Sequence, residues 1–422
     1  QLAYRETPMD GDGVPTSALL TPDGKPGVRA EYFGKDGKPI VTRIEPTVGG
    51  SGYDLAAVPE DYRAVWSGFL VPPESGTYRL GLTGFSGSLE FDGKPVKLAE
   101  FHWGDPPQLE TVTLEKGKRY PIRIATEVHG MGGAELLWKR VFTTPEEDLR
   151  TAAASADLIV AAIGLSSELE GEEMKREIEG FSGGDKTSLD LPADQRHLLE
   201  VAKSLGKPLI VVLFNGSPLD LSWAKQNASA IVEAWYPGQA GGLALADVLS
   251  GRTDPSGRLP LTFYHGLADL PPFGDYAMKG RTYRYFTGEP VYPFGFGLSY
   301  TSFAYGPVKV EQLKDGVRVT SSVTNKGDRA GEEVAELYLT PPAFEGAPRL
   351  ALRGFQHVAL APGESRMVSF DLSPRDLSFV TRDGDRQVMP GTYQVSVGSG
   401  QPGAGVPGGK ASFEAAAMPI AP

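Results

Sequence analysis

Helix and strand patterns alternate through the middle of the chain, and this alternation constrains the fold more than any other feature. Two apolar runs, residues 157–163 and 208–214, have the length and continuity of strands that are buried on both faces. A helix pattern over 193–205 lies between them, and another helix pattern begins at Thr144. Strands that alternate with helices predict a mainly parallel sheet that is covered on both faces.

Short alternating runs separated by turns flank this region on both sides. The chain has 53 Gly and 35 Pro, which favours β-domains with tight connections. Residues 28–141 contain several such runs, as in a β-sandwich, and Asp92-Gly93 predicts a tight hairpin turn. Alternation from residue 305 to 400 predicts a second, seven-stranded sandwich.

Three segments lack periodicity. We interpret residues 1–27 as a surface linker, the aromatic-rich residues 264–304 as a buried strap between two domains, and residues 401–422 as a disordered tail. We therefore predict a multi-domain chain with an all-β, an α/β and a second all-β domain. The three predicted domains are residues 28–141, 142–263 and 305–400.

Composition excludes several classes of partner. The chain has 41 basic and 53 acidic residues, a net charge of −12, which argues against nucleic acid. It has no Cys, and its five His show no metal-ligand spacing, so we expect neither disulfides nor a metal or cofactor. No apolar run reaches the roughly 18 residues of a membrane span.

An acidic loop follows the first apolar run. Its carboxylates are Glu168, Glu170, Glu172 and Glu173. In an open α/β sheet, ligands and chemistry gather at the carboxyl ends of the strands. Crowded carboxylates repel one another, so at least one is expected to have a raised pKa, and a neutral carboxyl can act as a general acid. A loop that is merely solvated is the alternative on spacing alone.

A series of motifs follows this loop, namely 181–192, 215–217, 234–242, 254–263, 280–286 and 292–301. In this order they resemble the C-terminal half of glycoside hydrolase family 3, the β-glucosidases and β-xylosidases. The resemblance covers residues 28 to about 400. It implies retaining hydrolysis of a terminal β-glycosidic bond by two carboxylates roughly 5 Å apart.

The resemblance assigns the acid/base role to Glu170, because many members carry this residue in a Glu-Gly pair, here with Gly171. The commoner pattern continues with an aromatic residue, Asp and Arg, whereas this chain has Glu172, Glu173 and Met174. The other glutamates of the loop therefore remain rivals, and Glu168 is expected to bind substrate.

The nucleophile of the family is an Asp on a (β/α)8 barrel of about 250 residues, which this sequence lacks. We therefore expect a split, processed or truncated chain that needs a barrel segment or chain as partner and is inactive alone. Residues 71–78 and the hairpin that follows them resemble the PA14 domain, in which Tyr53, Asp54, His102 and Trp103 are expected to line a sugar pocket. For Trp103, packing in the core of the domain is an equal alternative. Without an Asp-Asp pair, no calcium site is expected there.

The expected substrates are β-linked glucosides or short oligosaccharides. A β-glucosidase is preferred, with a β-xylosidase or a non-catalytic carbohydrate-binding module as alternatives. The chain starts at Gln1 with no basic-then-apolar leader, so we expect that either a leader was removed or the start of the protein is missing. The expected location is periplasmic or secreted. The chain could also form a homodimer, which the sequence does not decide.

Overall fold

A computed structural model describes most of the chain as two compact units. The first unit lies within residues 1–159, 165–187 and 192–208, and the second within 160–164, 188–191 and 209–422. The described residues are 12–49, 58, 61–83, 87–97, 109–129, 134–141, 144–166, 169–170, 179–183, 185–381 and 383–420.

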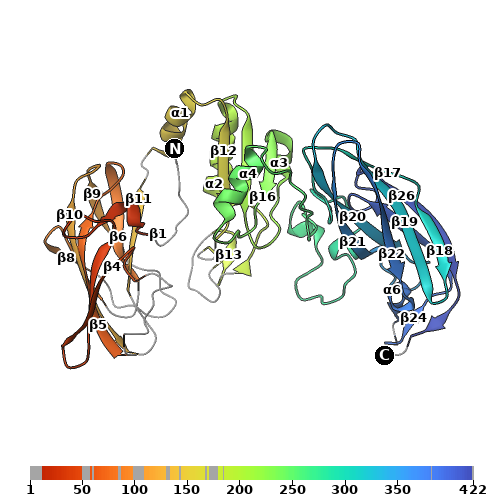
Figure 1. The fold of residues 1–422 in the computed structure, drawn as a ribbon, viewed down its shortest axis with the longest axis horizontal. Helices are drawn as coiled ribbons and strands as arrows, with labels where there is room; N and C mark the ends of the chain where they lie inside the picture. The colour runs from red at the N-terminus through yellow and green to blue at the C-terminus, as the bar shows by residue number, and fades with distance from the viewer. Residues whose placement is uncertain are drawn as a thin grey trace. The chain divides into compact units, whose positions relative to one another are not determined.

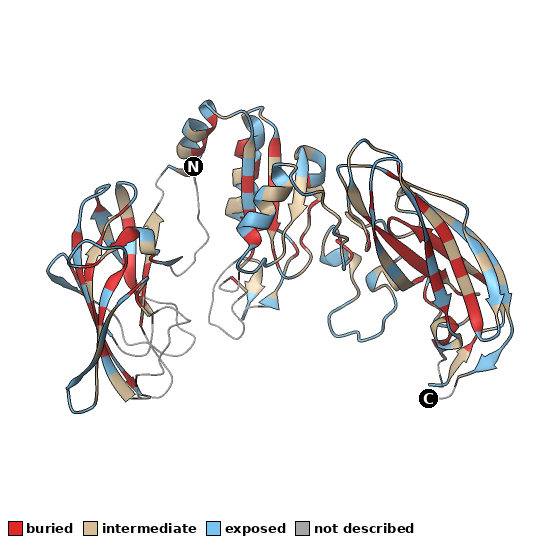
Figure 2. Ribbon diagram, in the orientation of Figure 1, coloured by how far each residue is buried: buried red, intermediate tan, exposed pale blue. Residues whose placement is uncertain are grey.

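Two antiparallel sheets form a sandwich in the first unit (Figure 1). One sheet has the order β1 (Asp12–Gly13), β11 (Glu135–Val141), β6 (Gly76–Thr83) and β9 (Leu109–Leu114). The other has the order β4 (Pro39–Glu45), β3 (Val28–Phe33), β5 (Asp61–Leu70), β10 (Tyr120–His129), β7 (Ser88–Phe91) and β8 (Lys94–Val96), with β2 (Leu19–Leu20) paired to β5. Alternate residues of β10 are buried, and Tyr120, Ile122 and Ile124 belong to the shared core. This alternation is what a half-buried strand requires. Figure 2 colours the ribbon of this sandwich by burial.

The sandwich begins earlier than the sequence indicated. β1 pairs with β11 and β2 pairs with β5, while the 3-10 helix η1 (Thr16–Ala18) lies between β1 and β2. Val14 and Leu19 are buried in the sandwich core. The predicted linker is therefore wrong for residues 12–27, because two-residue strands between turns are too short to show periodicity.

The hairpin turn at Asp92-Gly93 is confirmed. Phe91 pairs with Lys94, and the two turn residues have φ of 50° and 73°. Positive φ at both central positions defines the type I′ turn, which Asp-Gly favours because Gly adopts this conformation without steric cost.

Helices α1 (Pro145–Ala154) and α2 (Ala193–Ser204) belong to the first unit, where Glu146 Oε1 lies 2.7 Å from His197 Nε2. The first unit also holds a small hairpin of β13 (Phe181–Ser182) and β14 (Asp185–Lys186). Among the described residues, no helix is both long and apolar enough to span a bilayer.

The second unit contains a three-stranded sheet in the order β12 (Ile159–Gly164), β15 (Leu209–Phe214) and β16 (Ala230–Glu233). β15 and β16 are parallel, as the alternation of elements predicted, and α3 (Ser222–Asn227) connects them. Helix α4 (Gly241–Leu249) follows, with Leu243 64% exposed.

A second sandwich completes this unit. One four-stranded sheet runs β17 (Phe303–Tyr305), β19 (Gly316–Asn325) and β18 (Lys309–Leu313), with β22 (Ser365–Leu372) paired to β19. The other runs β21 (Ala351–Leu360), β20 (Gly331–Thr340), β25 (Gly391–Gly398) and β26 (Gly408–Ala415). A small sheet contains β23 (Phe379–Val380), β24 (Arg386–Val388) and β27 (Met418–Pro419), and α6 (Pro374–Leu377) precedes it.

The described part of this sandwich therefore has two four-stranded sheets instead of the seven strands predicted. The predicted disordered tail is also wrong, because β26 pairs along its whole length with β25, and β27 pairs with β24. Glycine lets the two backbones approach closely here, since a Cβ on Gly398 would lie 2.6 Å from the Pro407 carbonyl oxygen. A Gly-rich composition can thus indicate tight strand packing as well as disorder.

The aromatic strap packs against the second sandwich through part of its length. It contains the 3-10 helix η2 (Leu267–Asp269) and the short helix α5 (Thr282–Tyr285). The rings of Tyr283 and Phe294 stack with centroids 4.1 Å apart, and both contact Tyr338 edge-on. Phe273 and Tyr276, however, are 96% and 91% exposed. The prediction of a uniformly buried strap is therefore wrong, because buried and exposed aromatic side chains both occur in it.

Candidate active site

Glu170 lies on a turn that follows β12 in the chain. Gly164 ends the strand with φ of 129°, and a Cβ there would lie 1.9 Å from the Phe214 carbonyl oxygen, so only glycine fits. The N–H groups of Leu169 and Glu170 then donate to the side chain and the carbonyl of Ser166, at 3.3 and 3.0 Å. Leu169 is buried and anchors the turn, while Glu170 is half-buried.

A cation accompanies this carboxyl. Lys186, on the β13–β14 hairpin, is half-buried, and burial lowers the pKa of its ammonium while the charge of Glu170 acts in the opposite direction. Glu170 and Lys186 are therefore within electrostatic range of each other. A carboxyl that a turn holds in place and that is partly shielded from water can exchange a proton with a bound substrate.

The other predicted site residues cannot be placed. Glu168, Tyr53, Asp54, His102 and Trp103 lie outside the described residues, and so do the rival carboxylates Glu172 and Glu173. In the described ranges, no three His, Asp or Glu side chains gather so as to hold a metal ion.

Sequence reasoning missed a second carboxyl, at the carboxyl ends of β15 and β16 in the second unit. Glu233 ends β16, and its Oε1 accepts the N–H of Trp235 at 3.1 Å. Asn215, which follows β15, is fully buried and donates to the Ser217 carbonyl at 2.8 Å. Burial raises the pKa of Glu233 to about 7, and the nearby Asn215 amide lowers it in part. The only sequence signal was a Glu inside an otherwise apolar strand.

Two polar atoms at this edge are unsatisfied within the described part of the chain. Asn215 Oδ1 and Glu233 Oε2 are buried without a hydrogen-bond partner there. An ionised Glu233 would present only acceptors, whereas a neutral carboxyl supplies one O–H donor. Trp235, directly beyond, has φ of 53°, a strained value for a residue other than glycine. Strain and a perturbed carboxyl at a strand end are both typical of functional positions.

Comparisons with known proteins agree with this architecture. Residues 42–300 match the family described as the glycosyl hydrolase family 3 C-terminal domain, and residues 333–401 match the fibronectin type III-like domain. A xylan 1,4-beta-xylosidase from Xylanibacter ruminicola is 34% identical over 399 residues, which cover 90% of this chain and 46% of that protein. A periplasmic beta-glucosidase from Salmonella typhimurium is 37% identical over 265 residues, 58% of this chain and 33% of that protein.

Solved structures of beta-glucosidases have the same fold. The beta-glucosidase from Kluyveromyces marxianus in complex with glucose matches with a TM-score of 0.81 and 26% identity, over 99% of this chain and 54% of that chain. These proteins are all O-glycosyl hydrolases by name, and the chain belongs to glycosyl hydrolase family 3. The resemblance drawn from the motifs is thus confirmed. The chain spans about half the length of the curated xylosidase that it matches.

Proposed function

We propose that this chain supplies the acid/base part of a retaining, exo-acting β-glycosidase, with Glu170 as the general acid/base. The observation that carries the proposal is the position of Glu170, on an anchored turn that follows a strand of the sheet and within electrostatic range of the ammonium of Lys186. Its Glu-Gly pair with Gly171 agrees with the family's acid/base motif.

In the proposed reaction, Glu170 donates its proton to the glycosidic oxygen as the bond from that oxygen to the anomeric carbon breaks. The nucleophile, an Asp on the barrel of the complete enzyme, forms a covalent glycosyl-enzyme. Glu170, now ionised, takes a proton from water, which attacks the anomeric carbon and releases the sugar with retained configuration. Without the barrel the first bond cannot form.

The substrate is a β-linked glycoside with a terminal non-reducing sugar. The sequence led us to prefer glucosides, which the named beta-glucosidase relatives support. Xylosides are a second candidate, because the relative that aligns over 90% of this chain is named a xylan 1,4-beta-xylosidase. The name of the Salmonella relative supports the expectation of a periplasmic protein.

A non-catalytic role remains the competing proposal. The first sandwich, which resembles PA14 in sequence, would then bind carbohydrate, and the rest of the chain would be a scaffold. The acidic turn favours catalysis, because a binding module has no need of a carboxyl beside an ammonium at this position.

Assays on aryl β-D-glucosides and β-D-xylosides test the proposal. We expect no turnover by the isolated chain and turnover when the barrel-bearing polypeptide is added. Turnover by the chain alone, or none with the partner although the two polypeptides bind, would contradict the acid/base role. The ratio of kcat/KM on the two glycosides identifies the preferred sugar.

A further inference from the structure

Two arginines from distant parts of the sequence lie within electrostatic range of each other in the second unit. Arg284 is in α5 and Arg353 is in β21. The N–H of Leu352 donates to Tyr283 Oη at 3.0 Å, and the N–H of Arg349 donates to the carbonyl of Arg284 at 2.7 Å. These two bonds fix the start of β21 against α5. The first joins the residues that precede the two arginines in sequence, and the second ends on the backbone of Arg284 itself.

No carboxylate in the described part of the chain forms an ion pair with either arginine. The acid that acts on Arg353 from farther away is Asp376, whose Oδ2 already accepts the N–H and the hydroxyl of Ser373 at 2.9 and 2.6 Å. Arg386 adds a third positive charge, and its Nη1 donates to Ser378 Oγ at 3.2 Å.

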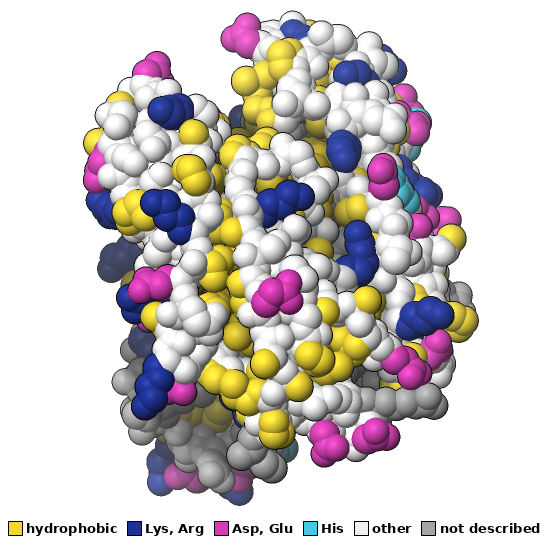
Figure 3. Space-filling model, turned by 90° about the vertical axis from the view of Figure 1, so that its right-hand side faces the viewer, with side chains coloured by type: hydrophobic (Ala, Val, Ile, Leu, Met, Phe, Trp, Pro, Cys, Tyr) yellow, Lys and Arg dark blue, Asp and Glu magenta, His cyan; other side chains and the backbone are white. Residues whose placement is uncertain are grey.

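This arrangement contrasts with the rest of the surface. On the face shown in Figure 3, Lys and Arg side chains are interspersed with Asp and Glu. In the same sandwich, Arg318 pairs with Asp371 through two hydrogen bonds of 2.7 and 2.8 Å. In a chain with 12 more acidic than basic charges, two adjacent arginines without an acidic partner are unexpected.

Aromatic rings hold both guanidinium groups in place. The Cζ atom of Arg284 lies 5.6 Å from the ring centroid of Tyr285, and that of Arg353 lies 5.1 Å from the ring centroid of Phe379. Nε of each arginine is buried and has no hydrogen-bond partner in the described part of the chain. Arg353 Nη2 makes one long bond, 3.5 Å, to the Ser378 carbonyl. The groups are thus oriented, but most of their donors are unused.

Arginine cannot relieve such repulsion by losing its proton, as a lysine can. The remaining means of compensation is a bound anion. The planar fork of a guanidinium matches the oxygen atoms of phosphate and sulfate, with two parallel N–H···O bonds for each group. We propose that Arg284 and Arg353 form a binding site for a small free oxyanion of the phosphate or sulfate type. This site is independent of the proposed glycosidase function.

Titration of the isolated chain with inorganic phosphate tests the proposal. At fixed pH and ionic strength, with chloride as the balancing anion, we expect a saturable rise in Tm of a few degrees and a matching heat of binding in calorimetry. Arg353→Met should abolish the response. Arg284→Lys, which keeps the charge but removes the fork, should weaken binding about ten-fold, a loss equal to one lost charged hydrogen bond.

Arg318→Met is the matched control, because it removes the same charge from the same sandwich and should leave phosphate binding unchanged. Circular dichroism checks that each variant folds, and Arg284→Lys provides a test even if Arg353→Met does not fold. Equal responses of all variants would mean non-specific screening and would overturn the proposal. Phosphate binding that does not saturate would also overturn the proposal. So would the absence of phosphate binding by the complete enzyme, because a carboxylate of the barrel segment would then occupy the site.

Discussion

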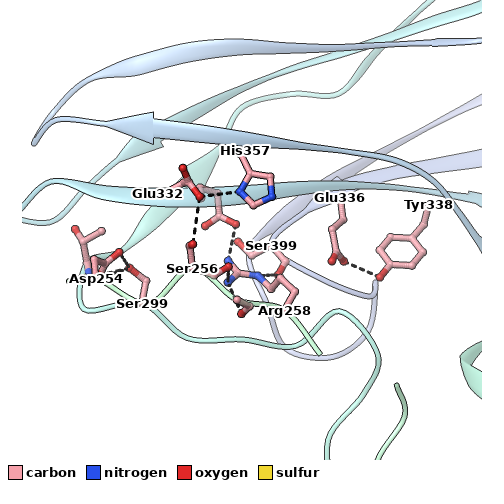
Figure 4. Close-up of polar contacts among 12 residues, drawn as sticks. Asp254, Ser256, Arg258, Ser299, Glu332, Glu336, Tyr338, His357 and Ser399 are labelled. Atoms are coloured by element: carbon pink, nitrogen blue, oxygen red, sulfur yellow. Dashed lines mark hydrogen bonds and ion pairs between the residues drawn. The ribbon is translucent and has the colours of Figure 1, made fainter. Parts of the chain in front are cut away.

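Arg258 Nη2 donates to Glu333 Oε1 at 2.8 Å, and both side chains are almost fully buried. The two residues are 75 positions apart, so their contact joins the loop before the strap to β20 of the second sandwich. Arg258 also donates through Nε to the carbonyl of Ser399 at 3.0 Å, as Figure 4 shows. Nη1 donates to the carbonyl of Ser256 at 3.0 Å, so each of the three nitrogens of the guanidinium has an acceptor. Such additional hydrogen bonds are the condition for a stable buried ion pair.

Arg258→Met should strongly destabilise the second unit, because it leaves the Glu333 carboxylate buried without its cation. Removal of one partner of a buried pair typically costs about 3–5 kcal/mol. Urea unfolding of the isolated chain measures the loss. Arg318→Met, which breaks an exposed pair with Asp371, is the control and should cost much less, because water screens an exposed pair. Equal losses in both variants would contradict a special role for the buried pair.

A second buried carboxyl near this pair should make stability depend on pH. Glu336 is 4% exposed and accepts the hydroxyl of Tyr338 at 2.6 Å (Figure 4), and burial raises its pKa to about 7. Between pH 4.5 and 7, the folded protein therefore holds a proton that the unfolded chain has released. The free energy of unfolding should fall as the pH rises through this window, by roughly 3 kcal/mol in total from this group.

Glu336→Gln should flatten that decline, since the amide is neutral at every pH and can still accept the hydroxyl of Tyr338. Denaturant unfolding at pH 5, 6, 7 and 8 gives the slopes. Glu311→Gln, an exposed site on β18, is the control and should keep the wild-type slope. If the free energy of unfolding of Glu336→Gln still falls with pH as in the wild type, another group causes the decline. Glu233 is then the next residue to replace.

The sequence predicted those parts of the fold that local patterns encode. The apolar runs of β12 and β15 are long and continuous enough to predict strands, and the Asp92-Gly93 turn depends on two residues alone. Strands β1 and β2 were missed because two residues have no period, and their pairing with β11 and β5 is set by tertiary contacts.

The candidate site was only partly accessible to such reasoning. The spacing of the acidic loop did not single out Glu170, and the resemblance to a family did. The perturbed pKa of Glu233 arises from burial, which one strand pattern cannot quantify. The pairing of Arg258 with Glu333, and the meeting of Arg284 with Arg353, depend on contacts between distant segments and leave no signal in local sequence.

The first sandwich should limit the length of substrate that the complete enzyme accepts. In sequence, α1 is the one element between the sandwich and β12, the strand that the proposed acid/base loop follows. Because β1 and β2 belong to the sandwich, the deletion should remove residues 12–141 rather than 28–141. We expect kcat/KM on longer oligosaccharides to rise relative to that on disaccharides. An unchanged ratio in the deletion variant would count against this role.

Glu170→Ala should remove protonation of the leaving group from the complete enzyme. A general acid typically contributes about 10²–10⁴-fold to the rate. The loss should depend on the leaving group, because an unactivated alcohol needs the proton, whereas a nitrophenolate departs without it. Rates on alkyl and nitrophenyl β-glycosides, measured side by side, therefore separate the loss of a general acid from a loss of folding.

Azide provides the second readout for the same variant. Without Glu170, no general base activates water against the glycosyl-enzyme, and the small azide anion needs no base. Added azide should therefore restore turnover and yield a β-glycosyl azide. Glu168→Ala and Glu172→Ala are the controls, since each removes a neighbouring carboxylate of the same loop. Rescue in one of these controls and not in Glu170→Ala would move the assignment to that neighbour. Normal rates of all three variants on alkyl glycosides would mean that the acidic loop is merely exposed to solvent and has no catalytic role.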